Sequence, residues 1–197
     1  MVGGVASRWA FTAVVVLVVV QRLAELRLSR RNEERLRRRG AIEAGAGHYP
    51  WMVALHTAFL LSAPLEVWLL DRPFVPWLAG AMAVLLVAAT ALRYWTIRTL
   101  GERWTTRIVC LPGGAVETGG PFRYLRHPNY LAVTIEMLAL PLLHTAWLTA
   151  GVFGLANGVL LVVRMRAEEA ALMSHTAYRE AFAEGPRRGG ERDGESP

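Results

Sequence analysis

Apolar residues gather in long runs that short, arginine-rich segments separate. The first run covers residues 9–20 and extends toward Leu28, the second covers 51–70, and the third covers 74–92 without a charged residue. A helix needs about 20 apolar residues to cross a hydrocarbon core of about 30 Å. The pattern therefore predicts three membrane-spanning helices before residue 93.

A fourth apolar run, residues 130–163, is too long for one crossing. As a single helix it would measure roughly 50 Å, against a hydrocarbon core of about 30 Å. We expect it to fold back at residues 141–145, with Gly154 and Gly158 giving the returning helix a small-residue face for close packing. The predicted fold class is all-α: a polytopic integral membrane protein with about five transmembrane helices, the last two forming a hairpin.

Two segments lie outside these runs. Residues 98–128 are polar and rich in Gly-Gly and Pro-Gly turn signals, so they are expected to form the largest extramembrane loop. Residues 185–197 are rich in Gly, Arg and Glu and are predicted to form a disordered tail, which leaves residues 1–184 as one membrane-embedded domain. The first run is expected to be retained rather than cleaved as a signal peptide, because no small-residue cleavage site follows it.

All 22 basic residues are arginines, and they concentrate in alternate connections. Eight lie between residues 22 and 50, six between 93 and 128, and six from 164 onward, whereas the turn at 71–73 contains only Arg72. Arginines favour cytoplasmic connections, so the amino terminus is predicted outside and the Arg126 and Arg164 regions in the cytoplasm. Their placement beside apolar runs favours membrane orientation over nucleic-acid binding.

The composition also limits the chemistry. Hydrophobic residues make up 53% of the chain, which favours lipid over water as the solvent of its core. The single cysteine, Cys110, excludes an intramolecular disulfide, and no His or Cys pattern near it is typical of zinc. No metal site is predicted.

Two polar clusters bracket the hairpin. The first is Arg126-His127-Pro128-Asn129-Tyr130, in which Pro128 fits the first turn of a helix whose amino-terminal amides favour an anion. The second contains Arg164 and Glu168, which share one helix face, with Glu169 directed elsewhere. A juxtamembrane anchor and an ordinary surface ion pair are the plain alternatives. The hairpin brings the clusters to one side, which favours a composite site.

Three other polar residues, His56, Glu66 and Glu136, fall at membrane depth. Ionisable groups are costly there unless they are paired, solvated in a cavity or bound to a ligand. Hydrogen bonding between helices is the favoured interpretation for each, and lining a lipid-accessible pocket is the functional alternative.

These residues resemble a known family. The cluster at 126–130, the preceding Gly119-Gly120-Pro121-Phe122, and Arg164 through Leu172 with Tyr178 and Phe182 are similar to the isoprenylcysteine carboxyl methyltransferase family of integral-membrane enzymes, which use S-adenosylmethionine. The closer likeness is to its bacterial branch of alkylpyrone and phenolic-lipid O-methyltransferases, often encoded beside type III polyketide synthases. Further similar positions are Gln21-Arg22, Glu25, Arg31-Asn32, Arg39-Gly40-Ala41, His48-Tyr49, Leu55-His56, Arg93-Tyr94-Trp95, Trp104 and Arg107. The likeness covers about residues 15–182.

The resemblance implies an S-adenosylmethionine site at the start of the hairpin and in the loop before it. The cofactor-binding residues that it implies are His127, Pro128, Asn129, Tyr130, Arg126, Phe122, Val116 and Arg107. It implies that Arg164 and Glu168 contact the methyl acceptor as the catalytic residues. Phe122 replaces a Tyr that some relatives have, a departure that bears on one hydrogen bond to the cofactor.

The implied acceptor is a lipid-like molecule from the bilayer, first a hydroxyl of an alkylpyrone or phenolic polyketide lipid, and second a prenylcysteine-type carboxylate. A hydroxyl must lose a proton, for which His127 and Glu168 are candidate bases, whereas a carboxylate needs none. The resemblance also implies a bacterial inner-membrane location, a cytoplasmic active site and a functional link to a polyketide synthase. Two other classes stay open: an NADPH-dependent membrane reductase, and a small transporter that uses Glu66 and Glu136.

Overall fold

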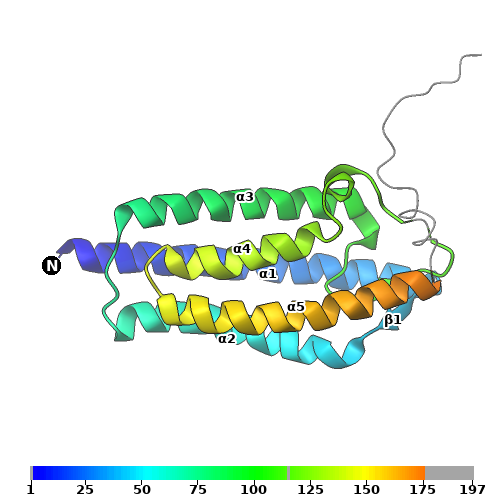
Figure 1. Ribbon diagram of the computed structural model, residues 1–197, viewed down its shortest axis with the longest axis horizontal. Helices are drawn as coiled ribbons and strands as arrows, with labels where there is room; N and C mark the ends of the chain where they lie inside the picture. Colours follow the sequence, from blue (N-terminus) through cyan, green and yellow to red (C-terminus); the bar gives the residue numbers. More distant parts are fainter. Residues whose placement is uncertain (1, 115, 176–197) are drawn as a thin grey trace, which may run out of the picture.

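The computed structural model describes residues 2–114 and 116–175, which form a bundle of five helices along a common axis (Figure 1). The helices are α1 (Val2–Arg38), α2 (Tyr49–Leu69), α3 (Pro76–Leu100), α4 (Pro128–Leu142) and α5 (Trp147–His175). This architecture confirms the predicted all-α class. The tail predicted over 185–197, and the family-like Tyr178 and Phe182, lie outside the described residues.

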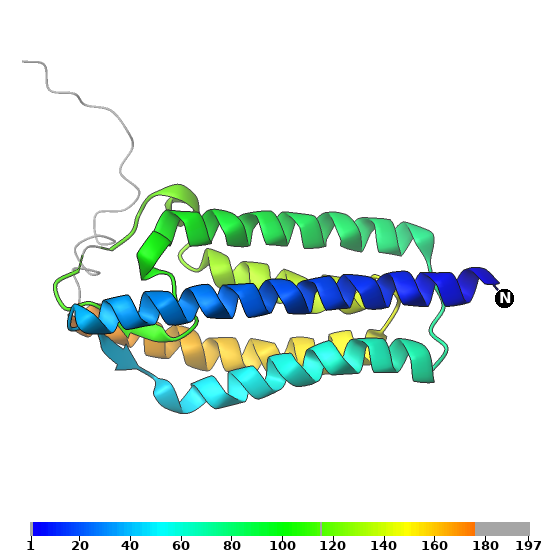
Figure 2. The same ribbon diagram turned by 180° about the vertical axis from the view of Figure 1, so that it is seen from behind.

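Helix α1 is one continuous element of 37 residues that joins the first apolar run to the basic segment after it. It lies across the back of the bundle, between α2 and α3 (Figure 2). No glycine or proline falls between Val5 and Arg39, so nothing in the local sequence interrupts the helix. It ends before Gly40, whose φ of 84° lies in the left-handed region that terminates helices.

Helices α1, α2, α3 and α5 are long and apolar enough to cross a membrane, by length and composition. Helix α4 has 15 residues, which corresponds to about 22 Å. It is therefore shorter than a hydrocarbon core of about 30 Å. Packing against the neighbouring helices must set its position along the membrane normal. It packs between α3 and α5.

The last two helices form the predicted hairpin, since α4 ends at Leu142, α5 begins at Trp147, and the two lie side by side (Figure 1). Gly154 permits their close approach, because a Cβ built there would lie 3.0 Å from Cδ2 of Leu138. The expectation for Gly158 is wrong: a Cβ there would meet nothing within 4 Å. One glycine, rather than a pair, sets this contact.

Short elements cover one end of the bundle. Strands β1 (Ile42–Ala44) and β2 (Ile108–Cys110) pair antiparallel, with Ile42 opposite Cys110. Three 3₁₀ turns flank them: η1 (Ala46–His48), η2 (Gly101–Arg103) and η3 (Gly120–Arg123). Ile108 and Cys110 pack against Ala171 near the end of α5. The sequence analysis missed this small sheet because three-residue strands carry too little periodicity to be recognised.

The opposite end contains the apolar core and a capping carboxylate. Phe11 and Val15 of α1 are buried there against α2 and α4. Glu66 accepts hydrogen bonds from the backbone amides of Leu148 at 3.1 Å and Thr149 at 2.7 Å, and pairs with Arg72 at 2.8 Å. Glu66 therefore caps the amino terminus of α5, in agreement with the interhelical interpretation of this residue.

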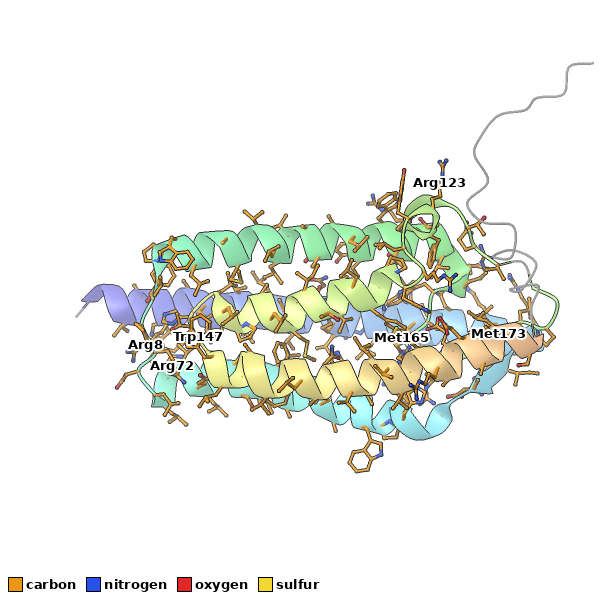
Figure 3. The ribbon with its side chains drawn as sticks, in the orientation of Figure 1. Arg8, Arg72, Arg123, Trp147, Met165 and Met173 are labelled. Carbon is orange, nitrogen blue, oxygen red and sulfur yellow. The ribbon has the colours of Figure 1, made fainter. Side chains whose placement is uncertain are left out.

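Arginines are distributed unequally between the two ends of the bundle. Arg8 and Arg72 lie at the end that carries the amino terminus, and Arg123 lies at the other (Figure 3). The connections from α1 to α2 and from α3 to α4, together with the exit of α5, all meet at that second end. The arginine-rich connections, which alternate along the sequence, thus lie together at one end of the bundle, and the other end has few arginines.

Candidate functional site

The phenol of Tyr130 lies at the centre of the candidate site. Pro128 begins α4, which places Tyr130 in the first turn, facing α5. Its hydroxyl accepts a hydrogen bond from Nε of Arg164 at 2.9 Å and donates one to the carboxylate of Glu168. The structure therefore brings the two sequence clusters together at a single hydroxyl group.

Arg164 also contacts segments that lie far away in the sequence. Its Nη2 donates to the backbone carbonyl of Thr106 at 2.6 Å, and its Nη1 contacts Sδ of Met52 at 2.8 Å. Only 6% of the residue is exposed. A buried guanidinium with partners on several sides is held in one orientation, because its planar fork fits them simultaneously. Arg164 is therefore a built part of the site rather than a surface ion pair.

His127 and Glu169 form a second contact beside the first. The Nε2 atom of His127 lies 3.1 Å from a carboxylate oxygen of Glu169, and the ring of His127 stacks on that of Tyr130 with centroids 5.2 Å apart. The expectation that Glu169 points elsewhere is wrong. His127, directly before α4, contacts Glu169, and Tyr130, in the first turn of α4, contacts Glu168, so two consecutive carboxylates of α5 meet the start of α4.

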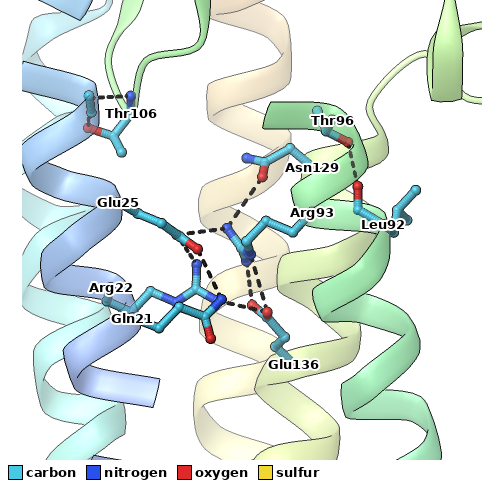
Figure 4. A network of polar contacts seen from close by, with 10 residues as sticks. Gln21, Arg22, Glu25, Leu92, Arg93, Thr96, Thr106, Asn129 and Glu136 are labelled. Carbon is cyan, nitrogen blue, oxygen red and sulfur yellow. Dashed lines mark hydrogen bonds and ion pairs between the residues drawn. The ribbon is translucent and has the colours of Figure 1, made fainter. Parts of the chain in front are cut away.

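Four charged residues deeper in the bundle form a neutral ionic cluster (Figure 4). Glu136 of α4 accepts hydrogen bonds from Arg22 of α1 at 2.8 Å and from Arg93 of α3, and Arg22 also pairs with Glu25. Arg93 further donates to Oδ1 of Asn129 at 3.3 Å, which links the cluster to the start of α4. Mutual pairing compensates for the desolvation of these charges.

An apolar cavity of about 400 Å³ adjoins both polar groups. Arg22, Arg93, Asn129, Tyr130 and Arg164 line its polar side. Its apolar walls come chiefly from α1, α2 and α4 and include Val18, Leu26, Met52, Phe59, Leu60, Val133, Met137 and Leu140. The helices that pack tightly at the far end therefore enclose an open volume beside the candidate site.

The cavity has an opening toward the outer surface of the bundle. Leu23 on α1 is 52% exposed, and Val53 and Leu61 on α2 are 45% and 60% exposed, yet all three line the cavity. Side chains that face both solvent and cavity mark its rim. The opening thus lies between α1 and α2, in the part of the molecule with apolar outer surfaces.

Six of the eight predicted cofactor residues, His127 and Pro128 among them, do not line this cavity. Phe122 in η3 and Val116 in the loop are partly buried, Arg126 is exposed, and none of them lines it. Arg107 pairs with Glu43 at 2.5 Å and stacks over the ring of Tyr49 at 4.2 Å. Their roles at the cofactor stay predictions.

The Glu43 and Arg107 pair ties β1 to the segment before β2. Burial acts to raise the pKa of the Glu43 carboxyl, but hydrogen bonds and charge from Arg107 and Arg37 outweigh it, so this pKa lies below its usual value. The hydrogen bond to Glu43 raises the pKa of Arg107. Both groups are therefore charged at neutral pH. Arg107 thus stabilises the contact between β1 and the segment before β2, next to the site.

Sequence reasoning missed several residues of the site. The carbonyl of Thr106 and the sulfur of Met52 hold Arg164 but have no recognisable sequence signal. Arg22, Glu25 and Arg93 were noted as family-like positions without a role. Their charge beside apolar runs was the available signal, because unpaired charge is costly at that depth.

Comparison with known proteins identifies the family. Residues 82–174, from α3 to the end of α5, match the isoprenylcysteine carboxyl methyltransferase (ICMT) family. YpbQ of Bacillus subtilis (strain 168) is 39% identical over 166 residues, which cover 84% of this chain and 98% of that protein. The chain belongs to the isoprenylcysteine carboxyl methyltransferase family. A Haemophilus influenzae (strain Rd) protein is 33% identical over 159 residues, covering 80% of this chain and 91% of its own length.

Membership in the isoprenylcysteine carboxyl methyltransferase family makes the chain an integral membrane methyltransferase. The matched range contains Tyr130, Arg164, Glu168 and Glu136, but not the α1 and α2 walls of the cavity. The names of the two relatives state no activity, so the acceptor must be argued from the chemistry of the site.

The residues around the start of α4 fit S-adenosylmethionine, which methyltransferases of this family use in general. A sulfonium cation is stabilised by carboxylates and aromatic faces, which Glu168, Glu169, Tyr130 and His127 provide within contact of one another. The first turn of α4 offers positive dipole character to the carboxylate of the cofactor. His127, Asn129, Tyr130 and Glu169 would hold this group, which supplies an activated methyl.

Proposed function

We propose that this protein is an S-adenosylmethionine-dependent O-methyltransferase whose acceptor is a membrane-soluble lipid. The cavity beside Tyr130 and Arg164 is the observation that carries this proposal, because its apolar walls end at a cluster of polar groups. An apolar pocket with a few convergent polar groups suits a ligand that has a long hydrocarbon part and one polar end. Methyl transfer then depends mainly on alignment and on the exclusion of competing water.

The acceptor is proposed to enter from the bilayer and the cofactor from the loop side. The rim residues Leu23, Val53 and Leu61 support lateral entry, since they face lipid on an integral membrane protein. The arginine-rich end supports a cytoplasmic site by the positive-inside rule. In a bacterial cell the inner membrane meets both conditions.

We propose a hydroxyl of an alkylpyrone or phenolic polyketide lipid as the methyl acceptor. The reaction would then follow that of a polyketide synthase, which makes such lipids. Three arginines line the cavity, and the two carboxylates among its lining residues are already bound to arginine. These charges would stabilise the anion of a modestly acidic hydroxyl, which supports an acceptor of this kind. A prenylcysteine-type carboxylate is the second candidate, supported by the activity for which the family is named.

Purified protein supplied with labelled S-adenosylmethionine and a membrane lipid extract is the direct test. We expect label in an extractable lipid, released by conditions that cleave aryl or enol ethers but stable to mild base. Carboxyl methyl esters are labile to mild base, so base-labile label would support the prenylcysteine candidate instead. Label found only in protein would reject the alkylpyrone or phenolic lipid as the acceptor.

Cofactor binding separates the proposal from a reductase. Calorimetry with S-adenosylhomocysteine and, separately, with NADPH should detect binding of the first ligand alone. A His127→Ala variant should lose this binding, whereas Arg123→Ala, at an exposed position outside the cavity, should retain it. Binding of NADPH alone would overturn the proposed methylation chemistry.

A further inference from the structure

His56 of α2 lines the cavity without a role in the contacts described above. Its Nδ1 lies 2.8 Å from the backbone carbonyl of Met52. A carbonyl oxygen accepts hydrogen bonds only, so Nδ1 carries the hydrogen and the neutral ring has a bare lone pair on Nε2. Among the described residues no hydrogen-bond partner engages Nε2, and His56 is part of the cavity lining.

The position of His56 relates it to Arg164. Met52 contacts Nη1 of Arg164, and His56 follows Met52 by one helical turn, about 6 Å further along the axis of α2. The imidazole therefore lies between the apolar part of the cavity and the polar group at Tyr130. An acceptor whose tail occupies the apolar walls would pass its polar end beside this ring.

Other titratable groups of the cavity are already engaged. Glu25 and Glu136 are bound to the arginines of the ionic cluster. Tyr130 is held by Arg164 and Glu168, and Tyr49 by a hydrogen bond with Thr106. The charges that act on the imidazole are Arg93, Arg22 and Glu136.

We propose that Nε2 of His56 is the general base that takes the proton from an acidic hydroxyl of the acceptor. This inference rests on the proposed function and deepens it, because a carboxylate acceptor needs no base. It also replaces His127 and Glu168 as candidate bases. His127 already contacts Glu169, and Glu168 already accepts a hydrogen bond from Tyr130.

The O–H bond of the acceptor breaks and its proton moves to Nε2 of His56. The oxygen forms a bond to the methyl carbon as the carbon–sulfur bond of a sulfonium methyl donor breaks, and the electron pair of that bond stays on sulfur as a neutral thioether. The imidazolium, which keeps its hydrogen bond to Met52, then returns the proton to water.

Two variants at one position test the base. His56→Asn retains an amide donor for the Met52 carbonyl, and His56→Gln places an amide near the position of Nε2, but neither contains a basic nitrogen. With a long-chain alkylphenol as acceptor, both should lose about 10²- to 10⁴-fold in rate at neutral pH. Their rates should rise with pH toward the wild-type rate as the phenol ionises in water. Thr90→Val, on α3 and outside the cavity lining, should keep the wild-type pH profile.

Graded acceptors sharpen this test. Ring fluorination or nitration lowers the pKa of an alkylphenol hydroxyl, so the deficit of both variants should shrink stepwise along the series. S-farnesylcysteine, whose carboxylate needs no base, should show no deficit at all if it is methylated. An equal deficit for every acceptor would overturn the proposal and assign His56 a packing role.

A readout without methyl donor completes the test. A long-chain nitrophenol bound to the wild-type protein should show the phenolate absorbance band down to a lower pH than when bound to His56→Asn. Identical titrations with both proteins would overturn the role of His56. The proposed function fails separately, if the wild-type protein binds no S-adenosylhomocysteine and methylates no lipid.

Discussion

At the scale of single residues, the guanidinium of Arg164 connects three separate parts of the chain. It holds the phenol of Tyr130, the carbonyl of Thr106 and the sulfur of Met52. An ammonium group can satisfy only part of this arrangement, because it lacks the planar fork of arginine. The geometry of the site therefore depends on the identity of the residue as well as on its charge.

Arg164→Lys should consequently lose methyl transfer although it keeps the positive charge. Each lost charged hydrogen bond is worth about 1.5–3 kcal/mol, so we expect a decrease in rate of about 10- to 150-fold. Initial rates with labelled donor measure it. Arg166→Lys, two residues away and exposed, is the matched control and should stay near the wild-type rate. Equal losses in both variants would contradict a specific role for Arg164.

His144, in the turn between α4 and α5, predicts a pH dependence of stability. Burial, together with the charge of Arg8, lowers the pKa of this imidazole below its ordinary value of about 6.5. Between the folded and unfolded pKa values the unfolded chain binds more protons, so stability rises with pH through this window and is complete above about 6.5.

Apparent melting temperatures in detergent should therefore fall as the pH drops below about 6.5. His144→Phe removes the titrating group while keeping a ring between Phe11 and Phe74, so it should flatten this part of the curve. A variant curve with the wild-type slope would show that another group causes the dependence.

At the scale of elements, the α4 and α5 hairpin depends on one glycine. Gly154→Leu should destabilise the protein by about 1–3 kcal/mol, because its Cβ already lies 3.0 Å from Leu138 and a larger side chain overpacks the contact. Gly158→Leu, on the same helix with open space around it, should cost little. Thermal melting in detergent compares them, and Leu138→Ala should partly restore the Gly154→Leu variant. Equal effects at both glycines would contradict this packing.

The amino terminus of α5 depends on a carboxylate from another helix. Glu66→Ala should destabilise by about 0.5–2 kcal/mol or more, since it removes a helix cap and leaves Arg72 without its buried partner. Asp71→Asn, which breaks an exposed pair with Arg8 at the same end, should cost less than about 1 kcal/mol. Melting of the two variants makes the comparison. Unchanged stability in Glu66→Ala, together with loss of an ion flux, would favour the transporter class.

At the scale of the whole molecule, both polar clusters must lie on one side of the membrane for the composite site to exist. The cysteine-free variant Cys110→Ala permits single-cysteine labelling, and the native thiol is a poor target because burial and the charge of Glu168 raise its pKa. Pro73→Cys and Arg123→Cys place exposed thiols at opposite ends of the bundle.

A membrane-impermeant maleimide should label Pro73→Cys in intact spheroplasts and Arg123→Cys only after the membrane is opened. This outcome follows from the concentration of arginines at the Arg123 end, which the positive-inside rule places in the cytoplasm. The reverse pattern would invert the orientation. Labelling of both positions from one side would contradict the bundle as a membrane-spanning unit.

The sequence alone determined the elements of this protein. Lengths of apolar runs predicted the spans, excess length predicted the hairpin, and Pro128 predicted the start of α4. These features depend on hydropathy and on local backbone preferences, which neighbouring residues set. The two ends of one hairpin necessarily lie on the same side of the membrane. The contact of Tyr130 with Arg164 and Glu168 could therefore be predicted from the sequence.

Tertiary structure alone decided which distant groups meet. Arg22 and Glu136 are 114 positions apart, and their contact depends on the rotation and register of α1 against α4, which side-chain packing sets. The same packing leaves the cavity open, places His56 in its lining and turns Glu66 toward the amides of α5. The hydropathy of the sequence predicts how deep in the membrane a residue lies. Which residue it contacts depends on how each helix is rotated in the bundle, and a uniformly apolar segment contains no sequence pattern that predicts this rotation.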